Sequence, residues 1–326
     1  MDFKPTAGEI ANIWKFVIGN QAHLCFLEHW MQHVEDEELK VILQRSIDEA
    51  NRIIIEGLEL YQKAGFPLPI GFSLDKDVDP KEPRLMSDKL IFFVLQVLLE
   101  YGVYGYGLTL GKTETPEVLS YFQMNLKNSS DLYKFITENI NKKGYQHQPI
   151  YVPVPKRAEL VEKQSFLSGW WGEQRPVNAI EIDSLIFSLR GVILAKTLYI
   201  VFSQISKDPM VQKYCHRGKE ICSKRVENIQ SLNSTENLPF LATYETEITN
   251  SSTSPFSEKL IMFEAMSLAE IAIARSGNAF SAVTRRDLST MFSLYIIETG
   301  TFLDDGLNLM IEKKWLDQPP LAANRK

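Results

Sequence analysis

Residues 87–93 read SDKLIFF and residues 257–263 read SEKLIMF, so one pattern recurs 170 positions later. In both copies a serine stands before an acidic residue, a lysine and an apolar run, as at the N-terminus of a buried helix. Self-similarity at a fixed offset is the sequence signature of a duplicated architecture. This stretch therefore predicts a chain built from two related halves.

The same offset pairs residues far outside this stretch without a gap. Chance supplies scattered apolar matches between helices, but it does not easily match glycine, proline and terminal Gln-Pro positions at one offset. We therefore interpret the chain as a duplication. The matched pairs include Leu68-Pro69 with Leu238-Pro239, Leu98 with Leu268, Glu100 with Glu270, Gly107 with Gly277, Phe122 with Phe292, Lys143 with Lys313, and Gln148-Pro149 with Gln318-Pro319.

Apolar residues at three- and four-residue spacing predict helices through most of the chain, and strand signals are nearly absent. In the first half a second helix follows the acidic turn 35–38, and Gly65 and Pro67 end it. The expected helices cover 8–34, the stretch from this turn to 64, 88–110 and 116–142, then 178–205, 209–232, 257–283 and 285–315.

Connection lengths predict the topology. Short joins link the first helix to the second and the third to the fourth, whereas long crossovers, 66–86 and 234–256, separate the second from the third. One long crossover lets the third helix run parallel to the second. The predicted fold class is therefore all-α, with two tandem ferritin-like four-helix bundles, each with a long crossover between its second and third helices.

The predicted domains are a first four-helix bundle at 1–143, a connector at 144–176 and a second four-helix bundle at 177–326. Prolines and glycines mark the connector. Its aromatic residues make it too apolar for a flexible linker, so we expect it to pack on the bundles. These residues are Tyr151, Phe166, Trp170 and Trp171.

Charge, the N-terminal sequence and the length of the apolar runs limit the partners and the location that we expect for the protein. The 326 residues carry 35 Lys+Arg against 41 Asp+Glu, a net charge of −6 without a basic stripe, so we expect no nucleic-acid partner. The N-terminus MDFKPTAGEI lacks the features of a secretory signal, which predicts a cytoplasmic protein. The apolar run at 90–99 is about half of the ~20 residues that a membrane span needs, so we expect no membrane span.

Three cysteines, Cys25, Cys215 and Cys222, cannot all pair within the chain. Cys215 and Cys222 lie seven residues apart on an expected helix, a rise of roughly 10 Å that exceeds disulfide reach. Each cysteine lies in or beside an apolar run, so we interpret all three as reduced core residues.

Several short motifs together resemble one protein family. They are Gly71-Phe72, Asp77-Val78, SDKL at 87–90, GWWGEQRP at 169–176, SEKLIMF at 257–263, RRDL at 285–288 and W-x-x-x-P-P at 315–320. As a set they resemble an uncharacterised tandem ferritin-like family of endospore-forming bacteria, sometimes described as spore-coat-protein-like. The resemblance covers nearly the whole chain and implies a ferritin-like fold and an association with spores, in the mother cell or the spore, but no substrate.

Ferritin-like bundles often hold two metals with a Glu on each of two helices and a Glu-x-x-His on the other two. Neither half contains Glu-x-x-His. A less specific set of polar side chains falls at about the same level along the helices of each half. The sequence allows two interpretations of this set: a buried polar network, with Lys196 and Lys219 as partners in the second half, or a metal site. The candidates are His23, Glu49 and Glu100 in the first half and Glu220, Glu270 and Glu298 in the second.

Two further groups have a functional and a structural interpretation. His29 and His33 are four apart and could chelate a metal, but they flank an acidic helix end and are predicted to be solvated surface histidines. Trp170 and Trp171 with Arg175 could form a ligand surface, whereas aromatic anchoring of the connector is the interpretation that we favour.

Two function hypotheses follow. The first is a non-enzymatic ferritin-like structural or interaction protein, associated with spores, whose partner is another protein or a second copy of itself. It needs no cofactor. The alternative is a metal-binding protein with iron or manganese and oxidase or peroxide chemistry at Glu100 or Glu270. The absence of Glu-x-x-His favours the first hypothesis.

Overall fold

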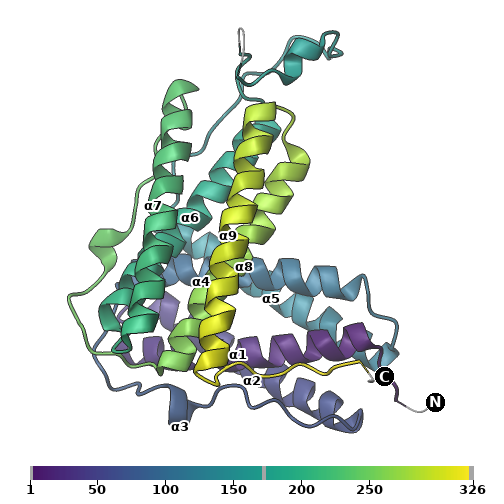
Figure 1. The fold of residues 1–326 in the computed structure, drawn as a ribbon, viewed down its shortest axis with the longest axis vertical. Helices are drawn as coiled ribbons and strands as arrows, with labels where there is room; N and C mark the ends of the chain where they lie inside the picture. Colours follow the sequence, from purple (N-terminus) through teal and green to yellow (C-terminus); the bar gives the residue numbers. More distant parts are fainter. Residues whose placement is uncertain (1–2, 171–173, 323–326) are drawn as a thin grey trace. The chain divides into compact units, whose positions relative to one another are not determined.

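A computed structural model describes residues 3–170 and 174–322. The first half forms four long helices, and a short helix α3 lies in its crossover (Figure 1). The bounds are α1 Ala7–His33, α2 Glu37–Lys63, α3 Leu74–Asp77, α4 Asp88–Leu110 and α5 Pro116–Lys142.

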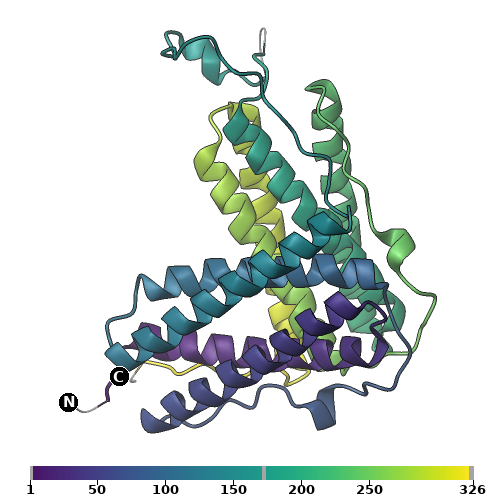
Figure 2. The same ribbon diagram turned by 180° about the vertical axis from the view of Figure 1, so that it is seen from behind.

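The second half repeats this plan with four long helices, shown from behind in Figure 2. Short 3₁₀ turns lie in the connector and in the second crossover, η1 at Gln164–Leu167 and η2 at Glu245–Glu247. The long helices are α6 Ala179–Ile205, α7 Pro209–Thr235, α8 Glu258–Ala282 and α9 Arg286–Glu312.

The predicted fold class is confirmed: the chain is all-α, with two four-helix units and a long crossover in each half. The expected bounds of α4 and α5 are those of the structure. The last helix ends at Glu312 rather than at 315, because Lys314 adopts a positive φ of 59° and turns the chain.

The ungapped offset of 170 is wrong for the first two helices of each half. α4 and α8, like α5 and α9, begin 170 residues apart, but α1 and α6, like α2 and α7, begin 172 apart. The crossover at 64–87 is two residues longer than its counterpart at 236–257, which absorbs the difference.

The ends of α2 and α7 show the corrected register. Gly65 and Asn237 both have positive φ, and the next amides bond alike, Phe66 to the Tyr61 carbonyl and Leu238 to the Asn233 carbonyl. Leu238-Pro239 therefore corresponds to residues 66–67, not to Leu68-Pro69 as the offset of 170 predicted. Glu100 and Glu270 do occupy the same position in α4 and α8.

The chain divides into two compact units that do not follow the sequence copies. The first comprises Met1–Tyr145, Glu247–Phe263 and Met310–Lys326, and the second comprises Gln146–Thr246 and Glu264–Leu309. The end of the second crossover and the C-terminal segment thus belong to the first unit. The predicted domain boundaries, 143 and 177, describe the sequence copies and stay a prediction.

The core of the first unit is apolar and aromatic, and it fixes how closely the helices approach. Tyr121 on α5 is buried and donates its hydroxyl to the Ile53 carbonyl of α2 at 2.9 Å. A Cβ on Gly57 would lie 2.7 Å from this hydroxyl oxygen, so only glycine fits. The buried cluster consists of Ile10, Ile13, Val17, Ile53, Tyr61, Tyr106, Val118, Tyr121 and Phe122.

The two crossovers pair with each other within the first unit. Isolated antiparallel bridges join Val78 to Phe256 and Met86 to Ile248. The second bridge is the first one shifted by 170 with the partners exchanged. The crossovers therefore contact each other reciprocally, as two identical subunits do across a two-fold axis.

Side chains at the N-termini of α4 and α8 repeat this reciprocity. Ser87 caps α4 and donates its hydroxyl to Glu247 at 2.6 Å, while Ser257 donates to Asp77 at 2.7 Å. Asp77 and Glu247 are again 170 apart, and the two serine amides donate to the carbonyls of these same residues. Each crossover thus holds the start of the third helix of the other half.

All three cysteines are free and buried, as predicted. Burial raises the pKa of Cys25 and of Cys222 to about 12. At neutral pH these thiols are protonated, which agrees with a role as core residues.

Two helices, α4 and α6, have the length and mean hydropathy of a membrane span. Buried residues make up 44% of the apolar stretch of α4 and 67% of that of α6. Core helices of folded proteins have the same composition, so these two helices are weak evidence for a membrane.

Candidate functional site: buried carboxylates at the helix ends

Glu9 lies in the first turn of α1 and is buried. Thr6 before it is the N-cap: its hydroxyl accepts the Glu9 amide, and the Glu9 carboxylate accepts the Thr6 amide at 2.6 Å. This is a capping box, which satisfies two amides that the helix leaves unpaired.

The same carboxylate also holds the start of α5. It accepts the amides of Glu114 and Thr115 at 2.9 and 2.7 Å and the Thr115 hydroxyl at 2.9 Å. Burial would raise the pKa of Glu9, but these hydrogen bonds outweigh it and lower the pKa to about 2. Glu9 is therefore an ionised buried group that joins the N-termini of two helices.

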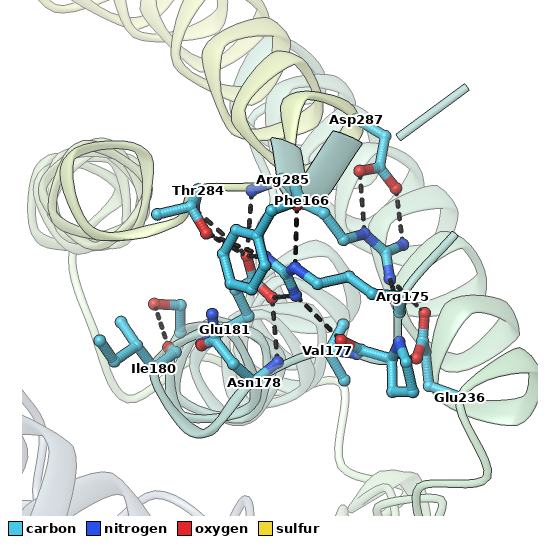
Figure 3. Close-up of polar contacts among 12 residues, drawn as sticks. Phe166, Arg175, Val177, Asn178, Ile180, Glu181, Glu236, Thr284, Arg285 and Asp287 are labelled. Atoms are coloured by element: carbon cyan, nitrogen blue, oxygen red, sulfur yellow. Dashed lines mark hydrogen bonds and ion pairs between the residues drawn. The ribbon is translucent and has the colours of Figure 1, made fainter. Parts of the chain in front are cut away.

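Glu181 is the counterpart of Glu9 in the second unit, at the offset of 172. Asn178 replaces Thr6 as the N-cap, and Glu181 accepts the Asn178 amide at 3.0 Å. It also accepts the amides of Thr284 and Arg285 and the Thr284 hydroxyl before α9 (Figure 3). The same joint thus occurs in both units.

The second unit adds an arginine to this joint. Arg175 donates from both terminal nitrogens to the Glu181 carboxylate, at 2.7 and 2.8 Å, and its guanidinium lies 3.9 Å from the Phe166 ring centroid. The Glu181 side chain is 0% exposed. Burial opposes ionisation, yet Arg175 and the amides lower the pKa of Glu181 to about 2.

Arg285 forms a second buried ion-pair group beside the first one (Figure 3). Its fully buried guanidinium donates to both oxygens of Asp287 and to Glu236. Glu236 in turn accepts the Val177 amide at 3.0 Å. These contacts raise the pKa of Arg285 further, so the start of α6, the end of α7 and the start of α9 are held by charge-assisted hydrogen bonds.

The chemistry of this arrangement is structural. Amide and hydroxyl donors surround both oxygens of Glu9, and the Arg175 guanidinium joins amide and hydroxyl donors around both oxygens of Glu181. A carboxylate with a pKa near 2 does not transfer protons near neutral pH. To bind a metal it would have to give up partners that a buried charge needs.

Among the first-half candidates, Glu49 has a cation partner. Its carboxylate pairs with Arg52 at 2.6 Å and accepts a hydrogen bond from the side-chain amide of Asn128 at 2.9 Å. Its carboxylate lines a surface groove of about 360 Å³ between α2 and α5. His23 and Glu100 are half-buried on α1 and α4, and burial lowers the pKa of His23 to about 4.

In the second half, two of the three candidates are exposed. The Glu220 side chain is 59% exposed and lies 3.3 Å from His216, and Glu298 is 46% exposed and pairs with Arg225 at 2.9 Å. Glu270 is half-buried on α8. Lys196, an expected partner, pairs with Glu245 at 2.8 Å instead.

Across residues 3–170 and 174–322, the structure brings together no group of three or more His, Cys, Asp and Glu side chains that could hold a metal ion. All six candidate residues lie in the described part of the chain, and the structure does not bring three of them together as metal ligands in either half.

The prediction that His29 and His33 are solvated surface residues is wrong. His29 is only 1% exposed. Its ring lies against His33 and Phe256, and His33 is half-buried with Nε2 2.8 Å from the Glu82 carbonyl. The crossovers cover this face of α1, which the neighbouring acidic residues concealed in the sequence.

The connector packs at both of its ends. At the N-terminal end, Tyr145 lies against the Phe92 ring and His147 Nε2 lies 2.8 Å from the Tyr244 hydroxyl. Residues 151–165 are exposed, whereas Phe166 is half-buried against Arg175, and Gly169 is buried where a Cβ would meet Asp287. Trp170 is exposed, and Trp171 lies outside the described residues. The expected aromatic anchoring therefore involves Phe166 rather than Tyr151 or Trp170, because Arg175 offers a cation to its ring.

Sequence reasoning missed Glu9 and Glu181 as a pair. Both stand three residues after a capping residue, Thr6 and Asn178, which is a readable signal for a helix start. The offset of 170 concealed their equivalence, because it aligns Glu9 with Ala179.

A protein-family model described as "Protein of unknown function (DUF3231)" matches residues 4–157 and 165–326. The two matched segments together cover most of the chain, and residues 158–164 between them lie in the exposed connector.

One solved structure is similar to part of the chain: that of a "putative spore coat protein" from Bacillus halodurans C-125. It is 18% identical, with a TM-score of 0.42, over 46% of this chain and 97% of the other. No curated protein matches the chain.

Proposed function

The chain belongs to the DUF3231 family, and we propose that it is a non-enzymatic, ferritin-like structural or interaction protein. One observation carries the proposal. The buried carboxylates that recur in both halves, Glu9 and Glu181, are saturated by donors from the protein itself. They stabilise helix junctions and leave no lone pair aimed at a substrate.

The other candidate carboxylates support the same proposal. Glu49 and Glu298 are each engaged by an arginine, so their charge is already compensated. A catalytic or metal-binding carboxylate is instead poised toward an open position. Binding of another protein, or of a second copy of the chain, needs no such group.

The motifs that resemble the spore-coat-protein-like family support an association with spores. We propose that the protein is made in the cytoplasm, acts in the mother cell or on the spore, and contacts protein partners rather than nucleic acid or a membrane interior. Antibody detection in purified spores and in vegetative cells tests this point; protein confined to vegetative cells would contradict it.

A thermal unfolding experiment tests the non-enzymatic, metal-independent character. Iron(II), manganese(II) and zinc(II) are added separately to the purified chain and to a Glu49→Gln, Glu100→Gln double variant. A ligand that binds the native state raises its unfolding temperature in a concentration-dependent way. We expect equal curves with and without metal; a rise that the double variant loses would support the metal-binding alternative.

A further inference from the structure

Residues 149–155 of the connector read PIYVPVP and lie outside every helix. Tyr151 is 84% exposed and Val154 is 93% exposed. No backbone hydrogen bond joins residues 149–155 to any part of the chain within 3–170 and 174–322. Tyr151, Val152 and Val154 of this apolar segment are therefore exposed, and its backbone groups have no backbone partner in the described part of the chain.

The segment favours an extended conformation. Val152 and Val154 each precede a proline, and a residue in that position avoids the helical region. The prolines fix their own φ, and the β-branched residues Ile150, Val152 and Val154 favour strands. Little conformational entropy is therefore lost when the segment pairs as a strand.

The prolines give this strand one blocked edge and one open edge. In an extended strand, alternate residues direct their N–H and C=O groups to opposite edges. Pro149, Pro153 and Pro155 all lie on one edge, where they supply no donor. Ile150, Val152 and Val154 lie on the other edge and retain their donors.

We propose that the open edge pairs with the same edge of a second copy of this chain. In an antiparallel pair with its two-fold axis at Val152, Ile150 faces Val154 and Val152 faces its equivalent. Each facing pair exchanges both N–H···O=C bonds. This inference rests on the self-association included in the proposed function, and it assigns residues 149–155 as the segment through which two copies bind each other.

The side chains are self-complementary in this register. Tyr151 faces Pro153, and Pro149 faces Pro155, at positions where the ladder requires no N–H group. Pairing with an unrelated sheet would need the open edge but not this palindromic order. The blocked edges then face outward, which ends growth at two strands and prevents fibres.

Sedimentation equilibrium of the full chain tests the proposal, with Val152→Pro and Tyr151→Pro as matched variants. Each adds one proline at an exposed position outside the helices, so neither is expected to affect folding. Val152→Pro removes donors from the open edge, whereas Tyr151→Pro adds a proline to the edge that is already blocked. A two-stranded ribbon is marginal in water, so we expect a weak, concentration-dependent dimer.

We expect the wild type and Tyr151→Pro to rise from 37.3 kDa toward twice that mass with concentration. Val152→Pro should weaken self-association by at least about tenfold. Hydrogen exchange should show protection of the amides of Ile150, Val152 and Val154 that grows with concentration.

A wild type that stays monomeric would overturn the proposal, as would a dimer that survives Val152→Pro or is lost equally in both variants. A monomer would remove this contact but leave the non-enzymatic assignment intact, because metal dependence tests that assignment separately.

Discussion

Replacing Glu181 with Gln removes the charge at the centre of the joint and keeps the size of the side chain. In the folded protein the pKa of Glu181 is about 2, against an ordinary value of 4.5. At 1.36 kcal/mol per pKa unit, this difference corresponds to roughly 3 kcal/mol of stability near neutral pH. No reduction for solvent screening applies, because the side chain is fully buried.

The pH dependence has a defined sign. Because the folded pKa is depressed, the contribution of Glu181 is fully present above pH 4.5 and is lost as pH falls from 4.5 toward 2. The free energy of unfolding of the variant should therefore be lower than that of the wild type by about 3–5 kcal/mol at neutral pH, which is the range for breaking a buried ion pair. The difference should become progressively smaller in acid.

Urea unfolding followed by circular dichroism, near neutral pH and near pH 3, measures this difference. Glu220→Gln is the matched control, because this carboxylate is exposed on α7 and its loss should change stability by no more than about 0.5 kcal/mol. Glu9→Gln should behave like Glu181→Gln in the first unit. A loss below about 1 kcal/mol at neutral pH, or one that does not shrink in acid, would show that the charge of Glu181 does not stabilise the joint.

Three further predictions concern packing, acid stability and the crossovers. Gly218→Ala should lower the free energy of unfolding by about 1–3 kcal/mol, because the new Cβ would lie 2.7 Å from the Tyr199 ring. Gly277 has open space around it, so Gly277→Ala should stabilise the protein, and thermal unfolding compares the two variants. Burial of His29 lowers its pKa from 6.5 to about 4, so the free energy of unfolding of the wild type should fall by roughly 3 kcal/mol as pH falls through this range. The His29→Phe variant should lose less stability over the same range, as measured by urea unfolding at a series of pH values. Ser87→Ala and Ser257→Ala should each cost about 1–2 kcal/mol, and equal losses are expected because their contacts are reciprocal; clearly unequal losses in urea unfolding would contradict that reciprocity.

The helices could be predicted because their signals are local. Apolar spacing, the N-cap Ser87 of α4 and Pro116 at the first helical position of α5 define these two helices, and both bounds follow from a few neighbouring residues. The register of the first two helices could not be predicted in the same way. The two-residue difference lies in crossovers without periodicity, and only the capping residues Thr6 and Asn178, which are 172 residues apart, mark it in the sequence.

The side-chain networks depend on contacts between distant segments. Glu181 shows its capping role in the sequence, but Arg175 and Thr284 reach it only after the connector and α9 have packed. His29 was misassigned for the same reason, since Phe256 covers it from more than two hundred residues away. Local patterns therefore predict the elements, and the tertiary arrangement decides which polar groups are buried.

Elemental analysis of the purified native chain, compared with the Glu270→Gln variant, shows whether the protein functions without a bound metal. We expect no stoichiometric iron, manganese or zinc in either protein, because the buried carboxylates that recur in both halves, Glu9 and Glu181, are satisfied by the chain itself. Stoichiometric metal in the native protein that disappears in the Glu270→Gln variant would contradict this expectation.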